Sequence, residues 1–414
     1  LAMLLFFVGG GFGFWYFFDL LKANPENLSR LFTAFYETPT NFVSNGLRWV
    51  NPIADMMIPQ RALLFGWSLL FPCLFLLHRA AIQRETSAFL PLGILAGTLP
   101  LIHTHSFLAL GIISGFYLIR SFARKEGKAQ WIGFAKYLGI VLLLALPQLI
   151  FFTFKQSGSF LKFHFNWANE ADNYFWFYIK NFGLIALLFP VAFLAANREE
   201  KGIVGGALLI FAIAEFVQFQ PNPYDNNKLL FIAFLYACGL VANWLFDAKD
   251  RLTRGAARSR LSIALLSAMV CATLFLSGAL TLGREYVSEY QLIDADQVAA
   301  AEYVKENAAP DATFLTYNNH NNCIAALTGR NIVCGTGSYL FFHGVDYSAR
   351  ENALPLLYEE PSTYFSAYAK QYDIDYVFIG SSELANYTVD LAYFADRFPV
   401  FFQNETVTIY SVHS

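Results

Sequence analysis

Long apolar runs separated by short polar segments dominate the first two thirds of the chain. A membrane-spanning helix needs about 20 mostly apolar residues, because the hydrocarbon core of a bilayer is about 30 Å thick. The pattern therefore predicts about nine spanning helices. Their approximate ranges are 1–20, 61–77, 88–102, 105–120, 131–154, 174–196, 202–219, 229–246 and 261–282.

The third and fourth of these runs are continuous in sequence. Residues 86–119 contain no Asp, Glu, Lys or Arg, and they include the stretch LPLIHTHSFLAL with Pro100, His103 and His105. One straight helix over 86–119 would be about 50 Å long at 1.5 Å per residue, which is too long for the bilayer core. The length predicts two short helices with a turn between Pro100 and His105.

Basic residues indicate how the spans are oriented. They concentrate in four loops, at 78–84, 120–128, 197–201 and 247–260. Loops rich in Lys and Arg stay in the cytoplasm, and all four loops can do so only if 88–120 is a helical hairpin. We then expect an active-site crevice at the outer face. The segments predicted there are 21–60, the His-Thr-His turn, 155–173, 220–228 and everything after about residue 284.

The pattern changes after residue 284, where short helices alternate with short strands. This alternation predicts a small α/β domain with a mainly parallel sheet, closed by a terminal hairpin in FPVFFQNETVTIYSV. We therefore expect a polytopic α-helical membrane domain at 1–284 and an extracytoplasmic α/β domain at 285–414. Cys323 and Cys334 both lie in the second domain, either as a disulfide or as two buried thiols.

Composition supports a membrane protein. The chain is 56% hydrophobic, 18% aromatic and 14% charged, against about 25% charged residues in typical soluble proteins. Its net charge of −3 argues against a nucleic-acid partner. The chain starts without Met and without the charged region of a signal peptide. We expect an integral plasma-membrane protein whose N-terminus is incomplete.

Two outer segments carry candidate chemistry beside apolar spans. In NPIADMMIPQRALLFG, Asp55 and Arg61 precede a span, and the arginine could clamp a phosphate or reach to the lipid headgroups. In HFNWANEADNYFWFYIKNFG, Glu170 and Asp172 could act as a general base or a metal pair, or belong to a solvated loop. Neither segment carries a motif that decides between these interpretations.

The segment EFVQFQPNPYDNNKLLF is more suggestive. Asp225, Asn226 and Lys228 together can hold a sugar diphosphate or a phosphate with its metal, or they cap a helix at the interface. His103 and His105 could share a metal, donate to a phosphate, or be two interfacial rings. A zinc site needs further ligands, and the neighbouring sequence supplies none. A divalent cation is the one cofactor these residues suggest, and its ligands remain unknown.

Several stretches resemble a known family. IPQRALLFG, LPLIHTHSFLALG, FWFYIKNFGL, QPNPYDNNKLLF and ALTGRNIVCGTGSYLFFHGVDYSARE resemble large bacterial and archaeal membrane proteins similar to the GT-C superfamily of glycosyltransferases. The resemblance implies a polytopic enzyme that uses a polyprenyl-phosphate-linked sugar at the outer face. It also implies an acidic residue in the first outer loop, which we expect to precede residue 1. Asp19 is a stand-in only by position.

The leading prediction is a membrane glycosyltransferase that acts on an unidentified acceptor. Its donor would be a lipid-phosphate sugar from the bilayer, because the sequence has no nucleotide-binding motif. Asp225, Glu170 and Asp172 are the catalytic candidates. The substrate-binding candidates are Arg61, His103, His105, Lys228, Asn226 and Asp55. The alternative is a transporter or flippase of lipid-linked or small polar substrates, for which broken helices and the intramembrane Glu215 would be suited.

Overall fold

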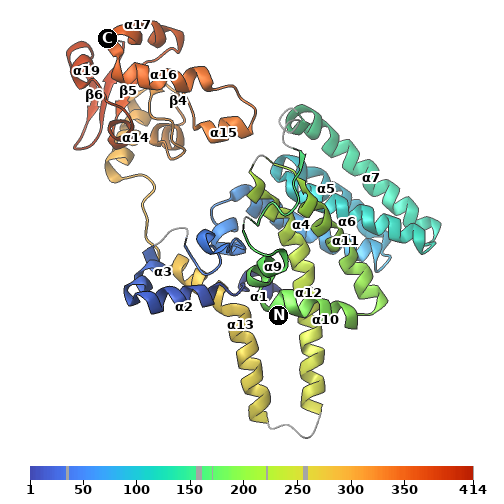
Figure 1. The fold of residues 1–414 in the computed structure, drawn as a ribbon. Coiled ribbons are helices and arrows are strands. Elements are labelled where there is room, and N and C mark those ends of the chain that lie inside the picture. The colour runs from blue at the N-terminus through green and yellow to red at the C-terminus, as the bar shows by residue number, and fades with distance from the viewer. Residues whose placement is uncertain (34–36, 155–160, 170, 221, 255–259, 414) are drawn as a thin grey trace. The chain divides into compact units, whose positions relative to one another are not determined.

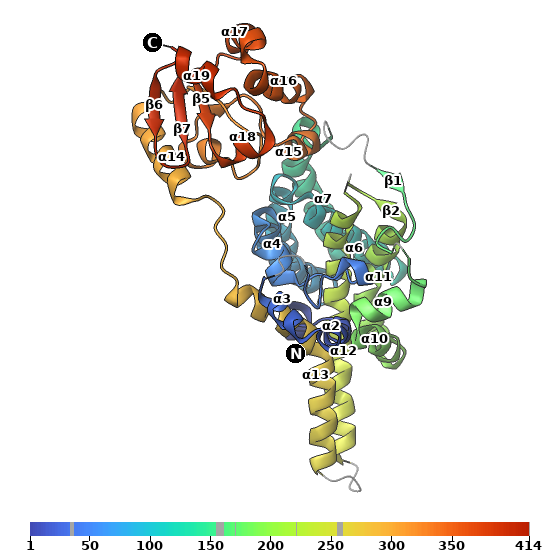
Figure 2. The same cartoon turned by 60° about the vertical axis from the view of Figure 1, so that its left-hand side comes forward.

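The computed structural model of the chain describes residues 1–33, 37–154, 161–169, 171–220, 222–254 and 260–413. The chain divides into two compact units, Leu1–Ser288 and Glu289–Ser414. Figures 1 and 2 show that the first unit consists of helices with one small pair of strands, and that the second is a sheet flanked by helices.

Helices of the first unit include several that can cross a membrane. Within the described ranges, five are long and apolar enough, and the bent pair α9 and α10 would make a sixth. The nine predicted spans are therefore not confirmed. The five lie within Arg61–Ala81 (α4), Thr104–Ala123 (α6), Lys128–Gln148 (α7) with the turn that follows it, Asn227–Arg254 (α12) and Arg260–Val287 (α13). The others are Ala2–Phe7 (α1), Gly13–Ala23 (α2), Arg30–Thr33 (α3), Phe89–Ile102 (α5), Tyr174–Phe182 (α9), Leu184–Ala195 (α10) and Arg198–Phe216 (α11).

The first predicted span, 1–20, is two short helices separated by a glycine segment. Glycine has a low helix propensity, and it lets two backbones approach closely because it has no Cβ atom. A Cβ atom on Gly10 would lie 2.8 Å from the backbone nitrogen of Gly278 in α13. One on Gly11 would lie 2.2 Å from the carbonyl oxygen of Lys180 in α9. The chain therefore crosses between these two helices where a continuous helix was predicted.

A second glycine bends the predicted span 174–196. Helices α9 and α10 meet at Gly183 and differ in direction by 98°. Gly183 has a φ of +60°, a backbone conformation that side chains with a Cβ atom rarely adopt. A Cβ atom on Gly183 would also lie 2.9 Å from the Cα atom of Gly11. The bend and the N-terminal crossing thus depend on one another.

The predicted break is present: α5 and α6 are two helices separated by the extended residue His103. Helix α11 differs from the predicted span 202–219, because it already starts at Arg198. Asn197 and Glu200 form a capping box at its N-terminus, so the charged first turn belongs to the helix. Neither α5 nor α11 is among the five helices that qualify as complete spans.

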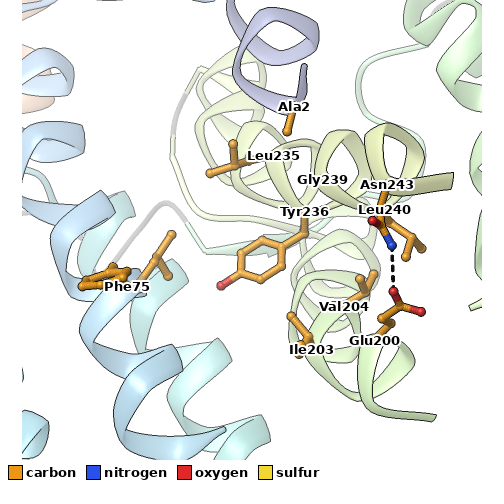
Figure 3. A pocket seen from close by; sticks show the side chains of 11 residues that line it. Ala2, Phe75, Glu200, Ile203, Val204, Leu235, Tyr236, Gly239, Leu240 and Asn243 are labelled. Carbon is orange, nitrogen blue, oxygen red and sulfur yellow. Dashed lines mark hydrogen bonds between the residues drawn. The ribbon is translucent and has the colours of Figure 1, made fainter. Parts of the chain in front are cut away.

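An apolar cavity of about 430 Å³ lies among α4, α11 and α12. Figure 3 shows that its polar atoms are few: Asn243 donates to Glu200 at 2.9 Å, and Tyr236 reaches in from α12. The same Glu200 side chain accepts from the backbone nitrogen of Asn197. Because this carboxylate is already used in the structure, the cavity is not the candidate functional site.

The second unit contains a five-stranded sheet with the order β4-β3-β5-β7-β6. Strands β4, β3 and β5 are parallel, and β7 runs antiparallel to β5 and β6. The predicted terminal hairpin is therefore present as β6 and β7, and it makes the sheet mixed. The strands are Thr313–Leu315 (β3), Asn331–Ile332 (β4), Tyr376–Ile379 (β5), Val400–Gln403 (β6) and Thr408–Ser411 (β7). The helices are Ala295–Asn307 (α14), Gly337–Phe342 (α15), Ser348–Glu359 (α16), Pro361–Gln371 (α17), Ser381–Asn386 (α18) and Leu391–Arg397 (α19).

Alternation along the strands places helices on both faces of this sheet. Leu315 and Val377 pack in one cluster with α16, α17 and α19. Phe314 and Phe378, their neighbours in sequence, pack in another with α14. Cys323 belongs to the second cluster and Cys334 to the first, and both thiols are free. The sheet thus separates the two cysteines.

Candidate functional site

Two histidines at the start of α6 form the centre of the candidate site. His103 is the N-cap residue of α6, and its Nδ1 atom lies 2.8 Å from the hydroxyl oxygen of Ser106. The ring of His105 lies 5.3 Å from that of His103, centroid to centroid. The extended backbone at His103 brings the two rings to the same place, which a continuous helix would not do at this spacing.

Both imidazoles are buried but incompletely bonded. His103 is 7% exposed and His105 5%, and within the described ranges neither Nε2 atom has a hydrogen-bond partner. A buried polar atom without a hydrogen-bond partner lowers stability by about 1 to 3 kcal/mol, so such atoms are uncommon in folded proteins. The two Nε2 atoms are therefore candidates for hydrogen bonds to a bound group.

Lys228 supplies positive charge to the same place. Its ammonium group acts electrostatically on both imidazoles. It also lies 3.0 Å from the carboxylate of Asp225, and both side chains are mostly buried. Lys228 belongs to the first turn of α12, which follows the short turn Pro223–Asn226. Four residues predicted from the sequence thus form two pairs, His103 with His105 and Asp225 with Lys228, and the charge of Lys228 acts on both histidines.

The amide of Asn226 holds the chain in place around this site. Its oxygen accepts from the backbone nitrogen of Phe219, and its nitrogen donates to the carbonyl oxygens of Ala214 and Val217. Asn226 is fully buried. The side chain was predicted to bind substrate, but its amide groups are engaged with the end of α11 and with β2 (Val217–Gln218). Strand β2 pairs with β1, Lys162–Phe163.

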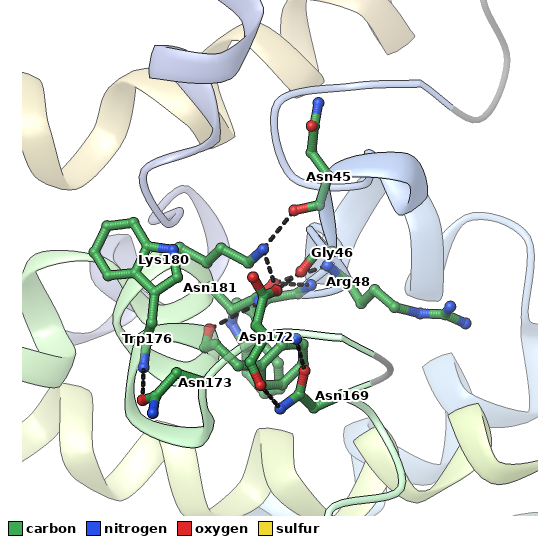
Figure 4. A network of polar contacts seen from close by, with 11 residues as sticks. Asn45, Gly46, Arg48, Asn169, Asp172, Asn173, Trp176, Lys180 and Asn181 are labelled. Carbon is green, nitrogen blue, oxygen red and sulfur yellow. Dashed lines mark hydrogen bonds and ion pairs between the residues drawn. The ribbon is translucent and has the colours of Figure 1, made fainter.

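A second polar network lies under the loop before α4, and Figure 4 shows its members converging. Lys180, only 3% exposed, forms an ion pair with Asp172 and donates to the carbonyl oxygen of Asn45. The side-chain oxygen of Asn181 accepts from the backbone nitrogens of Arg48 and Trp49, at 2.7 and 3.0 Å. These bonds fix the loop to α9.

Arg48 joins this network to the histidine site. Its carbonyl oxygen accepts from the hydroxyl of Tyr224 and, at 3.5 Å, from the amide of Asn227. Its guanidinium carbon lies 4.7 Å from the centre of the Tyr224 ring. Since Asn227 directly precedes Lys228, one short chain segment carries contacts to both networks.

Asp55 lies beside the turn that carries Tyr224. It accepts from the backbone nitrogen of Asn51 at 2.8 Å. Burial raises the pKa of Asp55 to about 6, although the Asn51 hydrogen bond and the nearby Arg284 lower it. The carboxyl group therefore changes its charge near neutral pH. None of its hydrogen bonds reaches the two histidines.

Arg61 and Glu170 are the two remaining candidates. Arg61 is exposed at the first residue of α4, and the described residues include no carboxylate paired with it. Glu170 lies outside the described residues. Asp172 is thus the one member of its predicted pair that the structure places.

The sequence analysis did not select Arg48, Asn45 or Tyr16 as site residues. Their place in the site follows only from contacts with residues that are far away in the sequence. Lys180 and Asn181 were visible as polar residues in an aromatic segment, and this was a usable signal. Their partners Asn45 and Arg48 lie more than a hundred positions earlier in the chain. No local pattern identifies such partners.

A metal finds few ligands here. Among the residues that the structure describes, no three His, Cys, Asp or Glu side chains converge as a metal site. Two imidazoles alone do not complete the coordination sphere of a zinc or magnesium ion. The arrangement instead offers N–H donors and positive charge, which are suited to binding an anion.

No family model and no curated protein matches the chain. Two similar solved structures are of an archaeal oligosaccharyltransferase from Archaeoglobus fulgidus. One is tethered to an acceptor peptide containing the NVT sequon, with 12% identity and a TM-score of 0.37. The other, called AglB, is in complex with an inhibitory peptide and a dolichol-phosphate, with 12% identity and a TM-score of 0.38. Each alignment covers 78% of this chain, which spans 45% and 46% of the two structures.

Proposed function

We propose that this protein is a membrane glycosyltransferase that takes its sugar from a polyprenyl-phosphate carrier. One observation supports the proposal above the others: two buried imidazole Nε2 atoms, which have no hydrogen-bond partner among the described residues, lie within electrostatic reach of the ammonium group of Lys228. Charged and neutral N–H donors of this kind match the acceptor oxygens of a phosphate group. Helices of the same unit are long enough to cross a bilayer, so a phosphate carried on a lipid is a reasonable ligand.

The hydrogen bond of His103 favours the same ligand. The hydroxyl of Ser106 can donate to Nδ1 of His103, which leaves the ring proton on Nε2 and makes that atom a donor. The N-terminus of α6 adds partial positive charge at the same point, since no side chain caps it. Phosphate oxygens would complete the bonds of both histidines.

In the proposed reaction an acceptor hydroxyl oxygen bonds to the anomeric carbon of the donor sugar. The bond between that carbon and the phosphate oxygen breaks, and its electrons leave with the polyprenyl phosphate. Lys228 and the two Nε2–H groups stabilise this charge. The hydroxyl proton passes to a carboxylate, for which we propose Asp225, 3.0 Å from Lys228. We place the reaction at the outer face, where the positive-inside rule assigns these loops.

The test uses the full gene product in lipid nanodiscs with radiolabelled polyprenyl-phosphate sugars and a membrane extract as the source of acceptor. We expect Lys228→Ala to lower transfer about 10²-fold or more, the size of effect seen when one charge-stabilising donor is removed. Lys128→Ala is the matched control, because Lys128 is exposed at the start of α7. Its transfer should equal that of the unaltered protein.

Binding of the lipid is measured in parallel, with radiolabelled polyprenyl phosphate retained on the protein. Saturable binding that Lys228→Ala weakens, together with transfer, supports the proposal. Saturable binding without transfer from any donor would overturn it and favour the transporter or flippase predicted as the alternative. If polyprenyl phosphate does not bind at all, the proposed phosphate site itself is wrong.

A further inference from the structure

We infer that a polar cavity over the Lys180–Asp172 ion pair binds a neutral saccharide. On the proposed function, this saccharide is the acceptor. The cavity has a volume of about 420 Å³, within the range of about 300 to 1,000 Å³ that small-molecule sites show. The lining residues used here are Tyr16, Asn45, Gly46, Arg48, Asp172 and Lys180.

Gly46 keeps the cavity open. It has a φ of +62°, and a Cβ atom there would lie 2.6 Å from the Oδ2 atom of Asp172 and 2.7 Å from the Nζ atom of Lys180. Any side chain at this position would therefore fill the space above the ion pair. A glycine here serves both the left-handed backbone and the access to the ion pair.

The ion pair beneath the cavity is neutral as a whole. Lys180 and Asp172 form an ion pair, so together they carry no net charge. Figure 4 shows the side chain of Arg48, which also lines the cavity, directed away from this pair, and its guanidinium group lies over the ring of Tyr224. An anionic ligand would meet the carboxylate of Asp172, and a cation would meet the ammonium of Lys180. The pair instead offers one strong acceptor and one strong donor side by side, which matches a ligand that carries hydroxyl groups.

An aromatic ring completes the match. The Nζ atom of Lys180 lies 5.8 Å from the centre of the Tyr16 ring, and Tyr16 lines the same cavity. A sugar ring has an apolar face of C–H groups and a polar rim of hydroxyls. An aromatic ring beside a donor–acceptor pair can contact both, because its body is apolar and the neighbouring groups are polar. Tyr16 belongs to α2, which otherwise has no assigned role.

The cavity adjoins the proposed phosphate site. A smaller cavity shares Arg48 and Ala168 with it and is also lined by Asn227. Asn227 directly precedes Lys228 in the first turn of α12. The loop residue Arg48 and the first turn of α12 thus link the saccharide cavity to the proposed phosphate site.

The test measures saccharide binding without donor, so that failure of this inference can be separated from failure of the proposed transfer. The full protein in nanodiscs is titrated with neutral tetrasaccharides of glucose, mannose and N-acetylglucosamine by calorimetry. We expect at least one to bind saturably and Tyr16→Ala to weaken that binding at least tenfold. Tyr286→Ala is the matched control, because Tyr286 is 91% exposed on α13.

A second variant keeps the test valid if Tyr16→Ala disturbs α2. Asp172→Asn should weaken saccharide binding at least tenfold, whereas Asp250→Asn, exposed on α12, should not. Lys228→Ala should abolish transfer and leave saccharide binding unchanged. The inference is overturned, even if transfer is observed, if no tetrasaccharide binds or if both cavity variants bind as tightly as the unaltered protein. Binding without transfer would overturn the proposed transfer alone.

Discussion

Two buried polar clusters in this chain differ in whether their hydrogen bonds are complete. In the second unit, Glu383 is 2% exposed, and its two carboxylate oxygens accept from the backbone nitrogens of Tyr317 and Gly380, at 2.7 and 3.0 Å. In the first unit, His103 and His105 are similarly buried, but their Nε2 atoms have no partner in the described part of the chain. Burial alone therefore does not separate a structural polar group from a binding site; completed bonds do.

The largest expected effect comes from breaking the complete cluster. Glu383→Ala leaves two backbone N–H groups unsatisfied, and we expect a loss of about 3 to 5 kcal/mol in the stability of the second unit. Glu383→Gln retains one acceptor oxygen, so its loss of stability should be clearly smaller than that of Glu383→Ala. Hydrogen exchange of the amides in β5 reports the change. Equal protection in Glu383→Ala and the unaltered protein would show that Glu383 does not hold this unit together.

Asp55 is an intermediate case, with one backbone donor and a buried carboxyl group. Its folded-state pKa, about 6, is above the usual value of 3.8, so the folded state holds its proton more tightly. The carboxyl therefore lowers stability as pH rises from about 4 to 6, by at most about 3 kcal/mol.

Asp55→Asn removes this titration and keeps an oxygen for the Asn51 nitrogen. We expect the unfolding temperature of the variant, relative to that of the unaltered protein, to increase as pH rises from 4 to 7. Unfolding is followed by intrinsic fluorescence in detergent. A difference that stays constant over this pH range would contradict the raised pKa.

Gly66 tests how the incomplete cluster is positioned. A Cβ atom there would lie 2.3 Å from the Cβ atom of His103, so Gly66→Ala must push α4 and α6 apart. We expect a loss of about 1 to 3 kcal/mol in stability, as for other overpacked sites, and weaker polyprenyl-phosphate binding. Gly111→Ala on α6 is the matched control, since its Cβ atom would meet no atom within 4 Å. Equal lipid binding by both variants would contradict the placement of His103 at the site.

The smallest effect on stability should come from the incomplete cluster itself. His105→Leu removes a buried nitrogen that has no partner, so stability should change by less than about 1 kcal/mol or rise slightly. Binding of polyprenyl phosphate should nevertheless fall at least tenfold. The comparison with Glu383 fails if His105→Leu is strongly destabilising, because the ring would then be part of a completed structural network.

Much of the fold could be predicted because it depends on local rules. The length of the uncharged run around His103 required a break, and the structure has one there. Alternation along β3 and β5 likewise required helices on both faces of the sheet. The predicted span 1–20 failed because Gly9, Gly10 and Gly11 allow a close crossing of α9 and α13, and the sequence names neither neighbour.

The candidate site likewise includes residues that could be predicted from the sequence and residues that could not. His103, His105, Asp225 and Lys228 could be predicted, because each is a polar residue at the end of an apolar run. Their polar character is visible in the sequence, whereas their positions in space are not. The cavity over Lys180 could not be predicted, because it forms from α2, the loop at Gly46 and α9, which are distant in sequence. Asn226 shows the opposite error, since a promising amide proved to be fully used by backbone groups.

The glycine crossing near the N-terminus sets an order for biogenesis. Gly10 packs on Gly278, and Ser277 both donates to the carbonyl oxygen of Gly11 and accepts from the backbone nitrogen of Phe14. The segment around Gly10 therefore completes its contacts only after α13, the last described helix of the first unit, has been synthesised. Until then the backbone groups of Gly11 and Phe14 lack their Ser277 partner, and α2 with Tyr16 is among the last parts of the site to be fixed.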